Sequence, residues 1–394
     1  MTRVGFFLNI TGQVWLGGTS YFRNLLTALA DLPEREIQPV ILTSSKTRPA
    51  LATELLSADW HCPPSLQRYN PRWIARKLLA RFTDRERLLE RDLQALGIEV
   101  LSHSGHLGPG ARIPALAWIP DFQHLRLPQN YSPPQRRSRD RLYAKLCRYA
   151  TRIIVSSHDA RKDLAEFFPE VVPKCRVLQF VANVPDPGTL PSREALERKY
   201  AFSGRYFFLP NQFWVHKNHR VVVDALSVLR HQGLAVTVLA SGKPADDRDP
   251  EHFRRLMGHA EALGVAVRFQ VLGLVPYAVL MALMWHSVAV INPSRFEGWS
   301  TTVEEAKSLG VPVIASDIAV HREQNPPAGA YFPPDNAEML AALMRQAWDA
   351  DLSESRRGLA DEARRQLAAR RAEFARQFES YVMECLAERR SAAR

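Results

Sequence analysis

The chain has 394 residues, of which 46% are hydrophobic and 24% charged. This composition excludes wholesale disorder, and the length exceeds what one ordinary hydrophobic core accommodates, so we expect two domains. The formal net charge of +11 favours an anionic partner, which is nucleic acid, an anionic membrane or a phosphorylated ligand. The four cysteines are scattered without a CxxC pair, which indicates free thiols rather than a disulfide framework or a zinc site.

Short apolar strands alternate with helical segments through the first half of the chain. Helices are expected over about residues 20–32 and 139–150. The predicted strands are Val4–Asn9, Val40–Thr43, Val100–His103, Ala115–Ile119 and Arg152–Ser156. This alternation predicts a parallel sheet covered by helices on both faces.

The segment Pro185–Arg193 is rich in Pro, Gly and Ser and is typical of a linker. The alternation then restarts, and residues 359–390 have the pattern of a long charged helix. The strands predicted in this half are Tyr206–Leu209, Ala235–Ala240, Val267–Val271, Val288–Ile291 and Val313–Ala315. Two parallel α/β domains place their strand ends at a cleft, where such folds bind ligands.

The segment from Asn292 to Asp317 joins two of these strands through a loop and a helix that Gly310 is expected to cap. The helix N-terminus offers N–H groups and a positive dipole end that suit a phosphate. Carboxylates repel phosphate but accept hydrogen bonds from the vicinal hydroxyls of a sugar. Glu297 in the loop and Glu305 in the helix therefore predict a nucleotide-sugar site. Alternatively, acidic residues simply stabilise a helix N-terminus, which explains Glu304 well, Glu305 adequately and Glu297 poorly.

This segment strongly resembles family 4 of the retaining glycosyltransferases, which share the GT-B fold. The family signature stands here as Pro293-Ser294, Glu297-Gly298, Glu305-Ala306 and Gly310-Val311-Pro312-Val313-Ile314. The resemblance implies an α/β fold of two Rossmann-like parallel-sheet domains facing across a cleft, with a C-terminal helix crossing back to the first domain.

The resemblance also assigns roles within this segment. Glu297 is expected to face the transferred sugar and Glu305 to hold the nucleotide ribose, while the backbone amides near Ser300 and Thr301 receive the diphosphate. Gly298 belongs to the same donor site. Ser300 and Thr302 replace a Gly and a Pro of the common pattern, a departure that bears on donor choice.

Lys217 follows a predicted strand and precedes a helix expected to begin at Asn218 or His219. There it is well placed to neutralise a diphosphate, although an exposed loop lysine is the alternative interpretation. Relatives carry an Arg where this chain has Gln212. Either Gln212 donates an amide hydrogen bond instead, or His216 or His219 supplies the missing positive charge.

Gly17 and Gly18 are expected to end the first βα loop, with Thr19 or Ser20 capping the following helix. A glycine pair allows close backbone approach to a ligand. By resemblance, this loop faces the donor and the acceptor across the cleft.

Asp121 and His124 follow another predicted strand at the same cleft edge. Relatives often carry His-Asp where this chain has Pro120-Asp121, and His124 is the candidate to take over a contact to the sugar or acceptor. A His satisfied by local backbone is the alternative. His103 and His106 also end a strand and rank lower.

Residues 71–82 predict a helix with Ile74, Leu78 and Phe82 on one stripe. The basic residues of its flanking faces are Arg72, Arg76, Lys77 and Arg81. A second cluster, residues 136–152, holds seven Lys or Arg and one Asp. Two such clusters in the acceptor domain favour an anionic membrane surface, and a solvated face on an ordinary core helix is the alternative.

We therefore expect an acceptor-side domain at residues 1–190, a nucleotide-sugar domain at 191–365 and a C-terminal helix at 366–394. The expected activity is retaining transfer of a mannosyl or related hexosyl group from a nucleotide-diphosphate sugar to a glycan or lipid-linked acceptor. Bacterial surface polysaccharide synthesis is the expected setting. The candidate catalytic residues are Glu297, Lys217 and His124.

No cofactor or metal is expected, because no Asp-x-Asp stands where the phosphates would need one and positive groups and amides do that work. The expected location is cytoplasmic, peripheral on the inner face of the membrane, since no run reaches the roughly 18 apolar residues of a spanning helix. A nucleotide-sugar 2-epimerase or hydrolase is the rival within this fold. A basic nucleic-acid-binding protein is the rival of another class, but the chain carries no RRM, zinc-finger or helix-turn-helix signature, so no nucleic-acid partner is expected.

Overall fold

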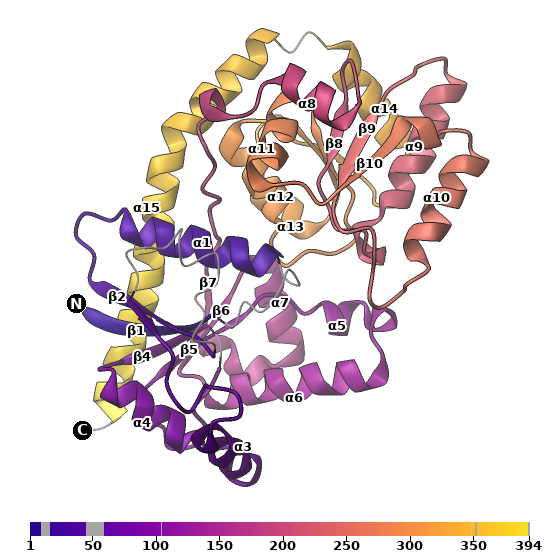
Figure 1. Cartoon of the computed structure of the whole chain (residues 1–394). Coiled ribbons are helices and arrows are strands. Elements are labelled where there is room, and N and C mark those ends of the chain that lie inside the picture. Colours follow the sequence, from indigo (N-terminus) through magenta and orange to yellow (C-terminus); the bar gives the residue numbers. More distant parts are fainter. Residues whose placement is uncertain (9–15, 45–58, 104, 351–352, 393–394) are drawn as a thin grey trace. The chain divides into compact units, whose positions relative to one another are not determined.

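A computed structural model describes residues 1–8, 16–44, 59–103, 105–350 and 353–392 of the chain. These residues form two compact units, each built around its own parallel sheet (Figure 1). The first unit contains Met1–Pro128, Pro133–Phe180 and Arg370–Arg394. The second contains Gln129–Ser132 and Val181–Ala369.

The sheet of the first unit has the strand order β3-β2-β1-β4-β5-β6-β7, and all its described pairings are parallel. Its strands are β1 (Thr2–Phe7), β2 (Ile37–Leu42), β3 (Asp59–His61), β4 (Val100–His103), β5 (Ala115–Ile119), β6 (Arg152–Val155) and β7 (Cys175–Val177). The helical segments are α1 (Leu16–Ala30), α3 (Pro71–Thr83), α4 (Arg87–Ala95), α5 (Gln123–Arg126), η1 (Pro128–Asn130), α6 (Pro133–Tyr149), α7 (His158–Phe167) and η2 (Pro169–Lys174). Each strand predicted here is present, although Asn9, the last residue of the first prediction, lies outside the described residues.

The sheet of the second unit has the order β10-β9-β8-β11-β12-β13 and is also parallel. Its strands are β8 (Phe207–Leu209), β9 (Val238–Ser241), β10 (Phe269–Gly273), β11 (Val290–Asn292), β12 (Val313–Ser316) and β13 (Ala330–Phe332). The helical segments are η3 (Pro187–Thr189), α8 (Arg193–Tyr200), η4 (Val215–Lys217), α9 (His219–His231), α10 (His252–Ala262), η5 (Ala266–Arg268), α11 (Tyr277–His286), α12 (Thr301–Leu309), α13 (Ala319–Gln324) and α14 (Ala337–Asp349). Helix α15 (Ser353–Ala392) begins in this unit and ends in the first.

The strands of the second sheet are apolar on both faces, which explains their nearly continuous hydrophobic sequences. Phe207 packs with α9, α10 and α14, whereas its neighbour Phe208 packs with α8, α11 and α12. Val238 and Leu239 divide between the same two cores. Because successive side chains of a strand point to opposite faces of the sheet, neighbouring residues are buried in opposite layers.

Three strands, β3, β7 and β13, were not predicted from the sequence. Each has three residues and lies at an edge of its sheet. Edge strands are half-paired and often short, so they lack the long apolar run that identified their neighbours.

The C-terminal part of α15 packs within the first unit. Phe374, Phe378 and Val382 are fully or almost fully buried there. The Glu379 carboxylate accepts hydrogen bonds from the backbone N–H groups of Glu36 and Ile37, just before and at the start of β2. The helix therefore supplies both apolar contacts and a polar cap to the sheet.

Among the described residues, no helix combines the length and apolar character that crossing a membrane requires. All four cysteines are free, as predicted.

Candidate active site

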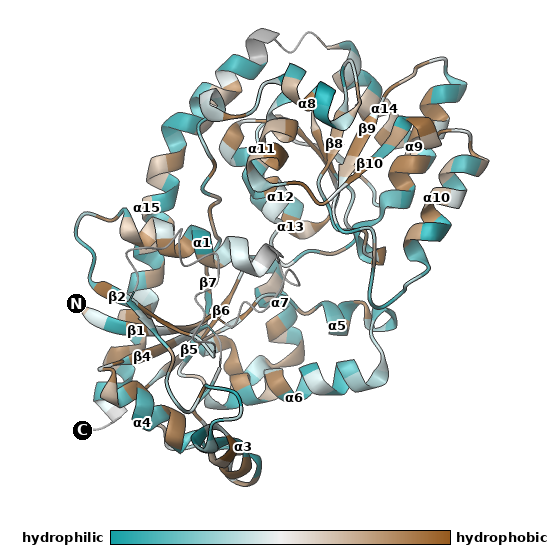
Figure 2. Cartoon of the chain, viewed as in Figure 1, coloured by the Kyte–Doolittle hydropathy of each residue, from teal (hydrophilic) through white to brown (hydrophobic). Residues whose placement is uncertain are grey.

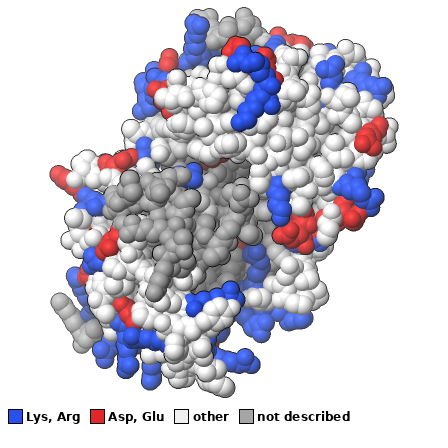
Figure 3. All heavy atoms as spheres, viewed as in Figure 1, with Lys and Arg blue, Asp and Glu red and all other residues white. Residues whose placement is uncertain are grey.

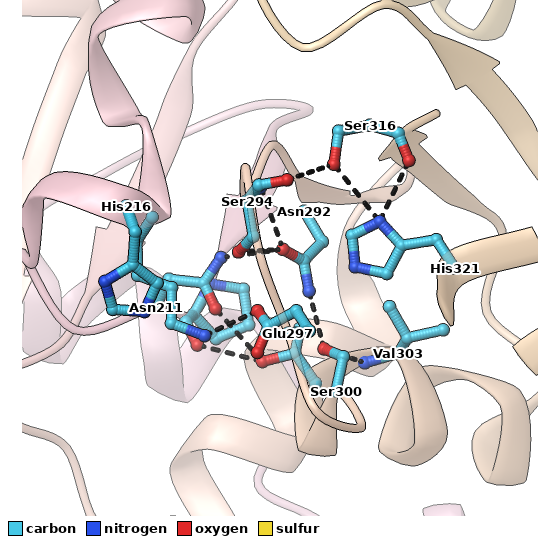
Figure 4. A network of polar contacts seen from close by, with 12 residues as sticks. Asn211, His216, Asn292, Ser294, Glu297, Ser300, Val303, Ser316 and His321 are labelled. Carbon is cyan, nitrogen blue, oxygen red and sulfur yellow. Dashed lines mark hydrogen bonds and ion pairs between the residues drawn. The ribbon is translucent and has the colours of Figure 1, made fainter. Parts of the chain in front are cut away.

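Asn292, the last residue of β11, organises the loop that leads into α12 (Figure 4). Its Nδ2 donates to Ser300 Oγ at 2.6 Å, and its Oδ1 accepts from Ser294 Oγ at 2.8 Å. Ser300 Oγ in turn caps α12 by accepting from the Val303 N–H. Because β11 belongs to a parallel sheet, this loop lies at the carboxyl edge, where ligands of such folds bind. The predicted C-cap is also present, since Gly310 has φ +72°.

Glu297 and Lys217 form an ion pair at this edge. Lys217 Nζ lies 2.5 Å from Glu297 Oε1, and the two side chains are only 13% and 10% exposed. Burial by itself raises the pKa of Glu297, but the charge and hydrogen bond of Lys217 hold that pKa below its usual value. The two charges therefore coexist in a site that is mostly shielded from water.

The first turn of α12 presents fewer free amides than predicted. The Ser300 N–H donates to Gln324 Oε1 at 3.1 Å, and Gln324 Nε2 donates back to the Ser300 carbonyl at 2.9 Å. The Ser300 amide is thus engaged by Gln324. Its expected role with the diphosphate stays a prediction. Thr301 and Thr302 hold the positions where an α-helix leaves N–H groups without intrahelical partners.

Glu305 lies on α12, where its side chain is buried. Glu304 in the first turn is also buried. Both carboxyl groups therefore lie inside the unit. Gly298 lies in the loop between Glu297 and α12.

The Gln212 side chain ties together two loops at the sheet edge. Its Oε1 accepts from the Lys243 N–H at 2.9 Å. Gly242 makes the approach possible, because it has φ +155° and a Cβ there would stand 2.4 Å from the Asn211 carbonyl oxygen. With Oε1 engaged, the amide Nε2 of Gln212 is the end that remains for a ligand.

Both histidines proposed as a substitute cation are buried, which disfavours their charged form. His216 is buried, and burial together with the charges of Lys217 and Arg248 lowers its pKa well below the usual value. His219 is fully buried and stacks on Phe213, with the two ring centroids 4.3 Å apart. Burial lowers the pKa of His219 to about 3. Charged imidazoles are disfavoured without water, so their burial favours the other alternative, in which the Gln212 amide donates.

Residues 193–366 match the family model described as glycosyl transferases group 1. These residues are a glycosyltransferase domain. The predicted enzyme class is thereby confirmed.

Solved structures support the same fold over nearly the whole chain. A glycosyltransferase from Rickettsia africae has 18% identity and a TM-score of 0.67, covering 98% of both chains. Anabaena HepE, solved with UDP and glucose, has 15% identity and a TM-score of 0.68, covering 98% of this chain and all of its own. WaaG, a glycosyltransferase involved in lipopolysaccharide biosynthesis, has 18% identity and a TM-score of 0.61, covering 94% and 99%. With the two parallel sheets, these likenesses confirm the predicted GT-B fold. No curated protein matches the chain in sequence.

In the first unit of the glycosyltransferase, the glycine pair lies inside a helix rather than in a loop. Helix α1 begins at Leu16, so Gly17 and Gly18 belong to its first turn, and neither Thr19 nor Ser20 is its N-cap. The absence of a side chain is tolerated in a first turn, so the helix extends past the expected cap. Residues 9–15, which precede the helix, lie outside the described residues.

Asp121 and His124 adjoin the end of β5 in the first unit. Asp121 Oδ1 accepts from the Gln123 N–H at 2.9 Å, which fixes the start of α5. His124 is buried on α5 against Tyr143, and its Nε2 lies 3.3 Å from Asp140 Oδ1. Burial lowers the pKa of His124. This imidazole borders a surface pocket lined by Leu125, Pro128, Pro133, Arg136, Arg137 and Asp140.

Several polar residues of the second unit were missed in the sequence. Asn292 and Gln324 hold the α12 N-terminus, and Asn218 donates to the Pro293 and Pro334 carbonyls from a left-handed backbone. His321 on α13 also joins the network in Figure 4. Asn292 and Asn218 could have been suspected because the first follows a predicted strand and the second precedes a predicted helix, a signal that many loop residues share. Gln324 and His321 carry no such signal.

Proposed function

We propose that the protein is a retaining, metal-independent glycosyltransferase of family 4. It would move a hexose, mannose or a related sugar, from a nucleotide-diphosphate sugar to a glycan or lipid-linked acceptor in bacterial surface polysaccharide synthesis. The observation that carries the proposal is the buried Lys217–Glu297 pair beside the N-terminus of α12. A cation, a carboxylate and helix amides together fit a ligand that has both phosphate charge and sugar hydroxyls.

The chemistry follows from charge. As the bond between the anomeric carbon and the diphosphate breaks, negative charge grows on the departing oxygen. Lys217 and the amides of Thr301 and Thr302 would stabilise that charge. The acceptor hydroxyl forms the new bond on the face that the diphosphate leaves, and its proton passes to the departing phosphate oxygen. Glu297 would hold hydroxyls of the transferred sugar, and no step requires it as a nucleophile.

The neighbours support this choice of ligand and setting. HepE was solved with UDP and glucose, and WaaG takes part in lipopolysaccharide biosynthesis. Within the described residues, no group of three His, Cys, Asp or Glu side chains is placed to hold a metal ion. Metal independence nevertheless remains part of the proposal.

A thermal-shift screen tests the proposal directly. UDP-, GDP- and dTDP-sugars are added to the protein with and without EDTA, and one nucleotide series should raise the melting temperature in both conditions. Lys217→Ala should abolish that rise, whereas Lys243→Ala, an exposed lysine of the same unit, should retain it. If no nucleotide sugar stabilises the protein, the proposal is wrong. Turnover of donor without any acceptor would instead favour the epimerase or hydrolase.

We further propose a peripheral position on an anionic membrane, with α3 as the contact. Helix α3 carries several hydrophobic residues (Figure 2), yet none of its residues is buried. Ile74, Leu78 and Phe82 are 45%, 56% and 83% exposed, which supports the membrane interpretation over the core-helix alternative. Lys and Arg also predominate over the lower part of the face shown in Figure 3.

The basic residues of α3 fall into two groups. Arg76 pairs with Glu86 and Arg72 with Asp92, so these two arginines anchor the helix to its own unit. Lys77 and Arg81 remain exposed beside the apolar stripe. A basic helix with an exposed apolar stripe suits the boundary of an anionic bilayer.

A further inference from the structure

His321 is a fully buried histidine of α13 that belongs to the same polar network as Glu297. Its Nδ1 lies 2.9 Å from the backbone oxygen of Ser316 and 3.1 Å from Ser316 Oγ. The Ser316 hydroxyl donates its own hydrogen to the Ser294 carbonyl. Because a carbonyl oxygen can only accept, Nδ1 must carry the ring hydrogen.

The other ring nitrogen, Nε2, is buried without a hydrogen-bond partner among the described residues. A buried polar atom in that state is costly, so its presence calls for an explanation. In neutral His321, this atom is an acceptor. In protonated His321, it becomes a charged donor. In Figure 4 the polar contacts of His321 run through Nδ1 to Ser316, whose hydroxyl donates to the Ser294 carbonyl, and Glu297 lies in the same network.

Two charged groups act on this ring. Burial lowers the pKa of His321, the carboxylate of Glu297 and the Ser316 carbonyl oppose that effect, and the ammonium of Lys217 adds to it. While Lys217 is paired with Glu297, the carboxylate needs no second cationic partner, and His321 stays neutral. A diphosphate changes this balance, because Lys217 cannot neutralise the phosphates and remain the full partner of Glu297.

We infer that His321 is the positioning residue that holds Glu297 once Lys217 turns to the diphosphate. His321 takes one proton from solvent onto Nε2 and pairs with the Glu297 carboxylate, so this carboxylate keeps a cationic partner while it receives the sugar hydroxyls. No covalent bond changes in this step. The inference rests on the proposed function, since it takes a nucleoside diphosphate as the ligand that draws Lys217 away.

The coupling between Lys217 and His321 can be tested without any nucleotide. Lys217→Met imitates the departure of the ammonium and leaves His321 in place. Histidine NMR titrations would follow the ring of His321, identified by the signal that disappears in His321→Gln. Its titration midpoint should move to higher pH in Lys217→Met and fall back in Lys217→Met/Glu297→Gln.

Two references make this result specific. Lys307→Met removes a lysine of α12 that contacts the Gln324 carbonyl, next to α13, and should leave the His321 midpoint unchanged. The signal of His103, in the other unit, should not move in any variant. A His321 midpoint that stays or falls in Lys217→Met overturns the inference.

Binding of UDP or GDP, whichever stabilises the protein, provides the second measurement. Calorimetric titration in buffers of different ionisation enthalpy should show net proton uptake near neutral pH. His321→Gln should still bind the nucleotide but lose the uptake. Binding with equal proton uptake in both proteins contradicts the role of His321, whereas no binding of any nucleotide contradicts the proposed function and leaves the NMR titration to decide on His321.

Discussion

At the scale of single residues, the site consists of charges that need one another. Lys217 and Glu297 lie 2.5 Å apart and largely out of water. Removing one partner of such a pair leaves the other charge buried and unpaired, which costs more than the pair itself contributes. Substitutions here therefore report on electrostatics as well as on ligand contacts, and each needs a readout that separates the two.

The two glutamates of the α12 segment should differ in what they bind. If Glu305 accepts hydrogen bonds from the ribose, Glu305→Ala should weaken binding of the free nucleoside diphosphate about tenfold or more, since a hydrogen bond to a charged group contributes roughly 1.5–3 kcal/mol. Glu297→Ala should leave that affinity nearly unchanged and lower turnover, because its proposed partner is the transferred sugar. Calorimetric titration beside a transfer assay measures both quantities.

Lys217→Ala serves as the third variant of this comparison and should impair both binding and turnover, because donor and product share the diphosphate. Far-ultraviolet circular dichroism must first show that each variant is folded, since Glu305 is buried in α12. Equal losses of nucleotide affinity in Glu297→Ala and Glu305→Ala would contradict the division of roles.

At the scale of elements, α3 and the C-terminal part of α15, both in the first unit, differ in whether their apolar faces are buried. Helix α15 buries Phe374 and Phe378. Helix α3 leaves Leu78 and Phe82 in solvent. Sequence periodicity is similar for a face that packs and one that does not, because it records only where apolar residues recur. The partner of each face distinguishes them.

The packing of α15 predicts a large effect of one substitution. Phe378 is fully buried against Phe6 of β1, with ring centroids 5.7 Å apart. Phe378→Ala should lower the free energy of unfolding by about 3–5 kcal/mol, because it opens a cavity in the core. Met383→Ala, at a 37% exposed position on the same helix, should change it by less than about 0.5 kcal/mol. Urea unfolding of both variants gives the comparison, and similar losses would show that α15 does not pack as described.

The exposed face of α3 predicts how the protein binds vesicles. Lys77→Gln/Arg81→Gln should weaken binding to anionic liposomes by about 2 kcal/mol, since each basic residue near such a surface contributes about 1 kcal/mol. Leu78→Ser/Phe82→Ser should weaken it through lost insertion into the bilayer. Co-sedimentation with vesicles of phosphatidylglycerol and phosphatidylcholine measures both.

Controls for this experiment come from the same chain. Val267→Ser, at a 76% exposed apolar position of the second unit, should bind vesicles normally. Arg72 and Arg76 should stay unchanged, because their ion pairs hold α3 in place. If the unmodified protein does not sediment with anionic vesicles, the peripheral-membrane proposal is wrong.

At the scale of the whole molecule, buried histidines in both units make stability depend on pH. Burial lowers the pKa of His103 in the first unit and of His219 in the second to about 3. In the unfolded chain, a histidine titrates near 6.5. Below that pH, the unfolded state binds more protons than the folded state, so protonation favours unfolding.

The free energy of unfolding should therefore be highest above about pH 6.5 and fall as the pH drops toward about 3. Each such histidine contributes at most ~1.4 kcal/mol per pH unit in this window. Urea titrations at several pH values should show a shallower fall for His219→Gln than for the unmodified protein. His231→Gln, at an exposed position, should leave the slope unchanged. An unaltered slope in His219→Gln would contradict the assignment.

The sequence by itself determined the fold class and the position of the α12 segment. Strands buried on both faces, such as Val313–Ser316, form continuous apolar runs, and Ser300 and Gly310 mark the ends of α12 by local chemistry that needs no distant partner. The tertiary structure alone decided which polar groups meet. It placed Gln324 on the Ser300 amide and Lys217 on Glu297, although these partners lie 24 and 80 positions apart, and it brought His321 into the same network. It also left the stripe of α3 in solvent. Helix caps and periodicity depend on neighbours in sequence, whereas ion pairs, burial and the resulting pKa shifts depend on neighbours in space, which one sequence does not specify.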